Sequence, residues 1–485
     1  MSNVTADYAC TMWDQRHKEL GKPGAGSGRL SKPGVMSEAG SGRLGCGGMI
    51  VRTHSRQPSP PQVRWLLAIS AVFALSVGLS NTFVNVYLWK VDHSYLPIGW
   101  YNFAMYTCIP LMFVAAGWLS GRLSAAWTLR MGIALHAGFY LLTLVGGTAL
   151  AAHPRPMGAL MGCAAGFYWL SFNYLSLRLT KAGGRDRFYG SNGALGAVAG
   201  MAAPLTAGFI ISHEDRFGGL SGYHVIFSAS LSLFLLAILF TLKMRVDGGG
   251  RLQIRRIAGG LENRWWRNVL AGCFVYGWRE GVFLFLIGLL MYIATGSEMK
   301  LGEFLLLQSG LSFLSFSWVS RWLKPERRPW VMGIGACGMA GAALLFLLPL
   351  SARLVVWYGC LVAVALPMFL VPLQGTVFDA IGRLDRTGED DVEHIIAREV
   401  VENAGRVAGI GAFLVIVAKH PTVGAISKFA VGLGFVQLVT WALVSTGGAQ
   451  KRIQTRAHTR MPRSAAEWEN VYSNRQAFWN RRARH

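Results

Sequence analysis

Two adjacent charged residues, Arg279 and Glu280, lie in the middle of an apolar segment that runs from about residue 268 to 295. A helix of that length spans the hydrocarbon core of a bilayer, which places both side chains near its centre. A charged side chain there costs at least about 2.5–3.5 kcal/mol, so such residues normally face a water-filled cavity or a partner. We therefore predict that both residues are functional. The alternative is an internal charge pair that only fixes helix packing.

Glu280 is the strongest candidate for proton coupling, because a buried carboxylate can bind and release a proton near neutral pH. Arg279 would then adjust the proton affinity of Glu280 or bind an anionic solute. Neighbouring residues of a helix point about 100° apart, so only one of the two need face a cavity. That angle argues against a simple direct ion pair.

Amide side chains within apolar segments are further candidates for contacts with a solute: Asn81, Asn85, Asn173, Gln308 and Gln374. By their spacing, Asn81 and Asn85 share one helix face with Gly78. Amides in a membrane can bind a solute or can join helices at about 0.6 kcal/mol per bond, and the sequence leaves both roles open. Glu303, before Gln308, is predicted to be an exposed acid at a helix start.

Charged residues near the ends of apolar segments are candidates for gating contacts: Arg122, Arg178, Asp379, Arg398, Glu402 and Arg406. The last three are spaced by four residues, so they stack on one face of a helix. Such a ladder can form an inner gate. The alternative is a helix extension in water whose ion pairs are solvated.

Motifs for metal, nucleotide and nucleophilic chemistry are missing from the sequence. The acidic cluster from Glu389 to His394 precedes a helix start, where acids are favoured by the helix dipole, so we predict no metal site. No GxxxxGK[ST] phosphate loop and no nucleophile–base motif occurs, and the seven cysteines form no CxxC pair. We therefore predict no cofactor and no enzymatic activity. An integral membrane enzyme acting on lipid is the least favoured alternative.

The composition predicts the elements that hold these residues. Of the 485 residues, 52% are apolar and only 15% are charged, against about 25% charged in soluble proteins. Apolar runs of about 20 residues recur, which indicates an all-α polytopic membrane protein. We predict twelve spanning helices over residues 65–89, 99–120, 128–149, 157–180, 191–212, 223–243, 268–295, 303–323, 330–350, 354–379, 399–419 and 425–447.

These helices divide the chain into two bundles of six, over residues 65–243 and 268–447, joined by a basic cytoplasmic connector at 244–267. Residues 1–64 are rich in Gly, Ser, Pro and basic residues and are predicted to be a disordered tail. A start at Met49 is an alternative. Residues 448–485 form a second basic tail.

The net charge of +23 would suggest a nucleic-acid partner in a soluble protein. Here Lys and Arg concentrate in the tails, the connector and every second loop, where they meet lipid headgroups, so we predict no nucleic acid. Because positive loops stay cytoplasmic, both termini are predicted to lie inside. We expect a multi-pass protein of the plasma membrane.

Weak matches at a shift near 200 residues indicate an internal repeat, with Gly78 over Gly277 and Arg178 over Asp379. The loop from Gly117 to Ala126 is similar to the signature G-x-L-a-D-r-x-G-r-r, but Gly121 stands where the signature has Asp. The chain resembles the major facilitator superfamily of secondary transporters over about residues 65–447.

The fifth predicted helix also has small residues at intervals of four: Gly196, Gly200, Pro204 and Gly208. They resemble a loose version of the motif of antiporter members, although small residues also pack helices closely in any membrane protein.

The resemblance implies a transporter that moves a small solute by alternating access between two pseudo-symmetric bundles, with the solute bound near the centre of the membrane. Protons are the expected coupling ion, and efflux by antiport is an alternative to uptake. A receptor or scaffold with the same fold is the second hypothesis, in which the tails would be the working parts.

Overall fold

The computed structural model describes residues 60–180, 185–213, 221–244, 261–384 and 391–459. All regular secondary structure in these residues is helical. The predicted tails and connector fall largely outside the described residues.

A described helix lies in each of the twelve predicted ranges. Most of them extend several residues beyond the predicted bounds. They are α2 (Pro60–Asp92), α3 (Tyr95–Ser120), α4 (Ala125–Ala151), α5 (Pro154–Leu179), α6 (Arg185–Ser212), α7 (Ser221–Thr241), α9 (Arg264–Thr295), α10 (Glu298–Trp322), α11 (Arg328–Ala343), α12 (Ala352–Leu384), α13 (Asp391–Lys419) and α14 (Val423–Thr459). Helix α7 ends two residues before its predicted bound, and α11 ends at Ala343, followed by a 3-10 helix over Leu344–Leu347 where the helix was predicted to reach residue 350.

Ten helices of the described residues are long and apolar enough to cross a membrane, so the chain is a multi-pass membrane protein. Helices α5 and α10 are not among the ten. Both are rich in Gly and Ser, and both pack between other helices, α5 on α3 and α4, and α10 on α6 and α12. Burial against protein lets such helices be less apolar than helices that face lipid.

Short loops end in residues that cap the next helix. The side chains of Ser94 and Ser124 accept hydrogen bonds from the first backbone N–H groups of α3 and α4, and Asn263 and Ser297 do the same for α9 and α10. Gly296 has φ +61°, a left-handed conformation that glycine adopts without strain. Only two residues, Gly296 and Ser297, therefore separate the end of α9 from the start of α10.

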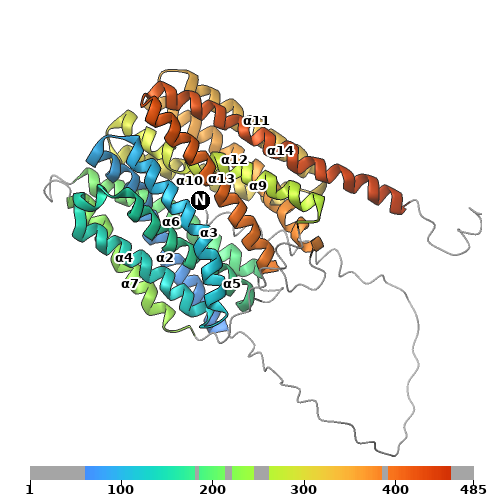
Figure 1. The fold of residues 1–485 in the computed structure, drawn as a ribbon, viewed down its shortest axis with the longest axis horizontal. Helices are drawn as coiled ribbons and strands as arrows, with labels where there is room; N and C mark the ends of the chain where they lie inside the picture. The colour runs from blue at the N-terminus through green and yellow to red at the C-terminus, as the bar shows by residue number, and fades with distance from the viewer. Residues whose placement is uncertain (1–59, 181–184, 214–220, 245–260, 385–390, 460–485) are drawn as a thin grey trace, which may run out of the picture.

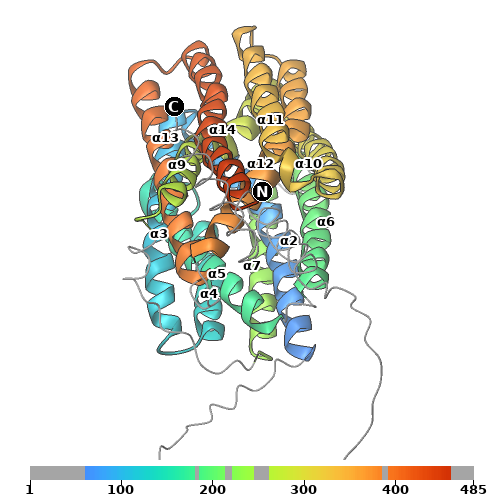
Figure 2. The ribbon, with the colours of Figure 1, turned by 90° about the vertical axis from the view of Figure 1, so that its right-hand side faces the viewer.

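The helices form two groups in space. We define the first helix set as α2 to α7 and the second helix set as α9 to α14; the sets lie side by side in Figure 1 and one above the other in Figure 2. In the first helix set, α2 packs on α6 and α7, and α5 packs on α3 and α4. In the second, α9 packs on α12, α13 and α14, and α11 packs on α12 and α14. The two sets meet mainly where α3 contacts α13 and where α6 contacts α10.

The close contacts between the sets gather toward the predicted outer end, where α2, α4, α6, α9, α11 and α13 finish. A Cβ atom added to Gly99 of α3 would lie 2.6 Å from a methyl carbon of Leu414 of α13. One added to Gly208 of α6 would lie 2.5 Å from the carbonyl oxygen of Glu298 of α10. The two sets therefore pack closely at these two places, by a side chain against Gly99 and by backbone against Gly208.

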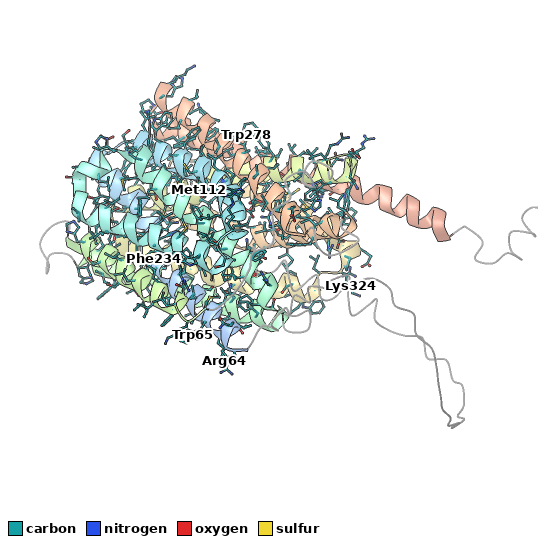
Figure 3. All side chains as sticks on the ribbon, turned by 60° about the horizontal axis from the view of Figure 1, so that its bottom comes forward. Arg64, Trp65, Met112, Phe234, Trp278 and Lys324 are labelled. Atoms are coloured by element: carbon teal, nitrogen blue, oxygen red, sulfur yellow. The ribbon has the colours of Figure 1, made fainter. Side chains whose placement is uncertain are left out.

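Four glycines bring α9 and α13 together inside the second helix set. Gly277 and Gly281 of α9 lie against the backbone of Glu402 and Arg406 of α13, and Gly405 and Gly409 of α13 lie against that of Phe274 and Trp278 of α9. Each pair of glycines has a spacing of four residues. A Cβ on Gly409 would lie 2.1 Å from the carbonyl oxygen of Trp278, labelled in Figure 3. We call these four glycines the glycine seam. Such small-residue stripes let the backbones of membrane helices touch.

We expect Gly405→Ala to lower the unfolding temperature of the purified protein. The new Cβ would lie 2.0 Å from the carbonyl oxygen of Phe274, and overpacking of this kind costs about 1–3 kcal/mol. Gly341→Ala is the matched control, because nothing lies within 4 Å of a Cβ added at Gly341. A Gly405 variant as stable as the Gly341 variant would show that the seam is loosely packed.

Candidate functional site

A continuous chain of ion pairs lies where α9 meets α13. Arg406 donates from Nε and Nη2 to Oε2 of Glu280, at 2.8 and 2.6 Å, and also from Nη2 to Glu402. Arg398 donates to the other oxygen of Glu402 at 2.9 and 3.1 Å and forms an ion pair with Glu399 at 3.1 Å. We call these five residues, Glu280, Arg406, Glu402, Arg398 and Glu399, the charge ladder.

Three neutral side chains complete the hydrogen bonding of the charge ladder. Tyr276 donates to Glu280 at 3.0 Å, Arg398 donates to Gln374 at 3.2 Å, and Arg406 donates to Asn403 at 2.9 Å. Such a network is what allows several charges to be buried together, because each unpaired buried charge would cost several kcal/mol. The ladder is buried or half-buried throughout. Its ion pairs are therefore not the solvated pairs of a helix extension in water.

The charge ladder holds three carboxylates and two guanidinium groups among the described residues. With all five groups ionised it carries one excess negative charge. A proton on any of the three carboxylates removes that excess, so the arrangement can store one proton.

The charge ladder reaches the first helix set at one aromatic ring. The guanidinium carbon of Arg406 lies 5.5 Å from the ring centre of Tyr106 on α3, within the range of a cation–π contact. The remaining titratable groups in electrostatic range of the ladder include Tyr276 and Cys273 on α9. A change in the charge of the ladder is thus felt at a contact between the two helix sets.

Arg279 leaves α9 in a different direction from Glu280, in keeping with the angle between neighbours on a helix. Its Nη2 donates to the hydroxyl of Tyr358 on α12 at 3.1 Å, and its guanidinium carbon lies 4.6 Å from the ring centre of Phe283. Arg279 is 4% exposed. The two adjacent charges found in the sequence therefore belong to two separate environments.

The structure brings only one of the five predicted amides to the charge ladder, namely Gln374. Asn85 instead accepts a hydrogen bond from Asn102 of α3 at 2.9 Å, a link within the first helix set. The other three predicted amides are half-buried and lie outside the ladder: Asn81, Asn173 and Gln308.

Three predicted gating residues lie apart from the ladder and from one another. Arg122 is exposed, 3.8 Å above the ring of Trp118, and Arg178 is exposed and donates to Tyr174 at 3.1 Å. Asp379 forms an ion pair with Arg328 of α11 at 3.0 Å. Each of these contacts stays within one helix set.

A polar link that was not predicted from the sequence joins the two sets at the predicted outer end. Glu298 of α10 is 6% exposed; it pairs with Lys90 of α2 at 2.6 Å and accepts from Tyr223 of α7 at 3.0 Å. We call these three residues the outer lock. A signal was present, because Lys90 is a lone cation at one helix end and Glu298 is a lone acid directly after a capping serine. Their pairing depends on how the two sets are placed.

Residues suited to a metal ion do not gather in the described part of the chain, where no three His, Cys, Asp or Glu side chains form a set of ligands. Glu389 and Asp390 of the predicted acidic cluster lie outside that part. The chemistry open to the site is proton binding and the recognition of charge.

Relatives of the chain are known from their sequences. It is 39% identical over 357 residues to the uncharacterized protein YqgE of Bacillus subtilis (strain 168). The matched residues are 73% of this chain and 82% of YqgE. The chain belongs to the family of YqgE. A second relative in that comparison, the uncharacterized protein in the sodM 3' region of Geobacillus stearothermophilus, is 41% identical over 164 residues, 34% of this chain and 75% of that protein. No family model matches the chain.

Solved structures show that this member of the YqgE family has the fold of the major facilitator superfamily. The Escherichia coli fucose:proton symporter FucP superposes with a TM-score of 0.56 at 11% identity, over 81% of this chain and 99% of FucP. The nucleoside transporter NupG gives 0.60 at 13% identity, over 79% and 98%. A bacterial homologue of the iron transporter ferroportin gives 0.61 in its inward-facing state, at 14% identity over 80% and 99%, and 0.56 in its outward-facing state.

Glu280 and Arg406 should behave as a coupled pair in a double-mutant cycle. Arg406→Gln leaves Glu280 without its cation, while Glu402 keeps Arg398; removal of one side of a buried pair costs about 3–5 kcal/mol. Adding Glu280→Gln removes the stranded charge, so the double variant should be more stable than the sum of the single effects predicts. Thermal unfolding in detergent measures all four proteins.

The control cycle combines Arg122→Gln with Glu303→Gln, since both side chains are exposed and their effects should add. Additive effects at Glu280 and Arg406 as well would contradict the pairing.

Glu298→Gln should loosen the predicted outer end. The variant removes the buried ion pair with Lys90, and a loss of about 1.4 kcal/mol between the sets raises an open population roughly tenfold. Spin labels at His93 and Thr422, which are exposed in loops of different sets, report the separation by pulsed electron resonance. Glu303→Gln on the same helix is the control. An unchanged distance distribution in Glu298→Gln would exclude the outer lock as a gate.

Proposed function

We propose that this protein is a secondary active transporter that carries a small solute across the plasma membrane by alternating access, coupled to protons. One observation carries the proposal: the Glu280–Arg406 ion pair is held in the middle of α9 and α13 and adjoins Tyr106 of the first helix set. A buried carboxylate at a contact between two rigid units can convert a proton gradient into relative motion of those units.

The membrane topology of the proposal is twelve spans in two pseudo-symmetric six-helix bundles, with both termini cytoplasmic. The two helix sets support the bundles. A repeat of local packing supports their symmetry, because Gly78 of α2 faces Ala199 and Ala203 of α6 as Gly277 of α9 faces Glu402 of α13. The alternation of basic loops along the sequence supports the orientation.

The conformation supports alternating access. The sets touch at the predicted outer end, and the ferroportin homologue superposes better in its inward-facing than in its outward-facing state. We infer that the molecule is closed to the outside. To open outward it must separate the outer lock and the contacts of Gly99 and Gly208, and close the opposite end.

The proton step follows from the geometry of the ladder. Protonation of Glu280 removes the charge that holds two N–H groups of Arg406, and Arg406 keeps Glu402 as its partner. The guanidinium is then free to shift relative to Tyr106. Proton binding inside the second helix set thereby alters a contact with the first.

Three alternatives have less support: an antiport mechanism, a receptor role and a membrane enzyme. The small residues of α6 pack on α10, where Gly302 lies against the carbonyl oxygen of Pro204 and Ser309 donates to that of Gly200; this contact accounts for the stripe without an antiport mechanism. A receptor role would depend on the tails, which lie largely outside the described residues. A membrane enzyme would need a catalytic dyad, and the buried polar groups of the site are ion pairs and amides.

Glu280→Gln should separate proton coupling from solute movement. A solute is first found by the rise in unfolding temperature that binding produces, with sugars, amino acids, organic anions and cationic drugs as the panel. In proteoliposomes that hold the Glu280→Gln variant, proton-driven transport of that solute should fall about tenfold or more, while solute exchange survives. A tenfold fall corresponds to a change of only about 1.4 kcal/mol in free energy. Glu303→Gln, an exposed carboxylate of α10, is the control. Unchanged proton-driven transport by the Glu280 variant would remove Glu280 from the mechanism.

A further inference from the structure

Arg279 is a buried cation with no carboxylate partner. Within the part of the chain that the structure describes, no Asp or Glu oxygen lies within 4.0 Å of its guanidinium group. Its Nε is buried and has no hydrogen-bond partner. By contrast, Arg398 and Arg406 in the charge ladder each contact two carboxylates. Arg279 therefore lacks the negatively charged partner that a guanidinium group in the middle of a membrane helix normally requires.

The surroundings of Arg279 are aromatic. The rings of Phe283 and Tyr358 stack with centres 5.7 Å apart and planes 20° apart, and Phe346 lies 4.6 Å from the Tyr358 ring. The Tyr358 hydroxyl accepts from Arg279, which fixes the guanidinium plane while Nε stays unpaired. A planar cation beside flat apolar walls suits a small anion with a planar charged group and an apolar body.

We propose that Arg279 binds the carboxylate of a small organic monoanion, and that this anion is the solute carried together with one proton. The proposal rests on the transport function proposed above and specifies its substrate class. Guanidinium and carboxylate groups match as planar, two-point partners, and Nε is one of the two donors used in such pairs. Phe283, Tyr358 and Phe346 would contact the apolar part of the anion.

Charge balance couples the anion to the proton. The charge ladder has one more carboxylate than guanidinium groups, and Arg279 adds one guanidinium group. The six side chains together are therefore neutral when neither a proton nor an anion is bound. A bound proton alone leaves one positive charge, and a bound monoanion alone leaves one negative charge. Both together restore neutrality. Because unbalanced charge in the membrane interior is costly, the empty and the fully loaded forms change conformation readily, and the half-loaded forms do not.

Several other groups around the two sites bear on the pH dependence. Tyr106, Tyr276 and Cys273 face the charge ladder, together with the neutral amides of Gln374 and Asn403. Arg279 faces the hydroxyl of Tyr358. The proton that accompanies the anion is assigned to the charge ladder, with Glu280 as the carboxylate that binds it in the function proposed above.

Binding is tested first, on the full-length protein in detergent. The probes are benzoate, lactate and acetate as monocarboxylates, succinate as a dianion, inorganic phosphate and sulfate, and glucose as a neutral solute. We expect monocarboxylates to raise the unfolding temperature of the wild-type protein and of Arg353→Gln, a matched variant at an exposed arginine. Arg279→Gln should bind them roughly 10- to 100-fold more weakly, as expected for a lost charge-assisted hydrogen bond. Tyr358→Phe should show a smaller loss.

Each result bears on the proposal. A monocarboxylate effect that survives Arg279→Gln overturns it, as does stabilisation by phosphate, sulfate or glucose alone, or by no probe at all. Because Arg279→Gln can fail to fold, Arg279→Lys is made in parallel; it keeps the charge, loses the planar fork, and should retain weakened binding.

Transport by proteoliposomes then separates this proposal from the proposed function. Uptake of the bound monocarboxylate should follow an inside-alkaline pH gradient and ignore a membrane potential set with potassium and valinomycin, since the loaded carrier is neutral. Uptake that responds to the potential overturns the one-to-one stoichiometry. Binding of the monocarboxylate without uptake would support the anion site and contradict the transport function. Proton-driven uptake of glucose would support the transport function and contradict the anion site.

Discussion

The ion pair between Glu280 and Arg406 is the contact on which the functional interpretation depends, and it exists because two helix backbones touch. In a hydrocarbon surrounding, a carboxylate is stable only beside a counter-charge. The glycine seam brings α9 and α13 into backbone contact, so that an Arg406 side chain can place two donors on one oxygen of Glu280. Larger residues at the seam would separate the helices and leave Glu280 without its cation, while Arg406 would keep Glu402 on its own helix. Packing and electrostatics are therefore one constraint here.

Charge is divided unequally between the two helix sets. The buried charged side chains among the described residues all belong to the second set: Arg279, Glu298, Arg328, Glu393, Arg398 and Glu402. The first set uses neutral links instead, such as Ser70 with Asn192 and Ser80 with Tyr140, and a stack of rings around Phe73. A neutral, aromatic unit is well suited to act as a rigid support. The buried carboxylates Glu298, Glu393 and Glu402 all belong to the second set, so in the proposed mechanism it is this set whose energy changes when a carboxylate binds a proton.

The sequence predicted the helices well, because apolar length is a local property that each segment carries by itself. It also pointed to Arg279 and Glu280, and to the spacing of Arg398, Glu402 and Arg406. It did not predict that Glu280 would pair with Arg406, which is 126 residues away, nor that Lys90 would pair with Glu298. Contacts between distant helices depend on their mutual placement, which hydropathy does not encode. Glycines spaced by four at 277 and 281 and at 405 and 409 were the one readable sign that α9 and α13 meet.

The positions of the polar links suggest how the two sets influence each other. The outer lock joins α2 and α7 to α10 at one end, and Tyr106 meets Arg406 between α3 and α13. Both links therefore connect the same two helix sets through different helices. A rotation that opens the outer lock must also move α3 past α13, where Gly99 and Leu414 are in contact. A change in the interactions of Arg406 within the charge ladder therefore also changes the free energy needed to open the outer lock. In the proposed mechanism, a proton bound at the charge ladder therefore acts on the outer lock through the movement of α3 past α13, with no direct contact between the two sites.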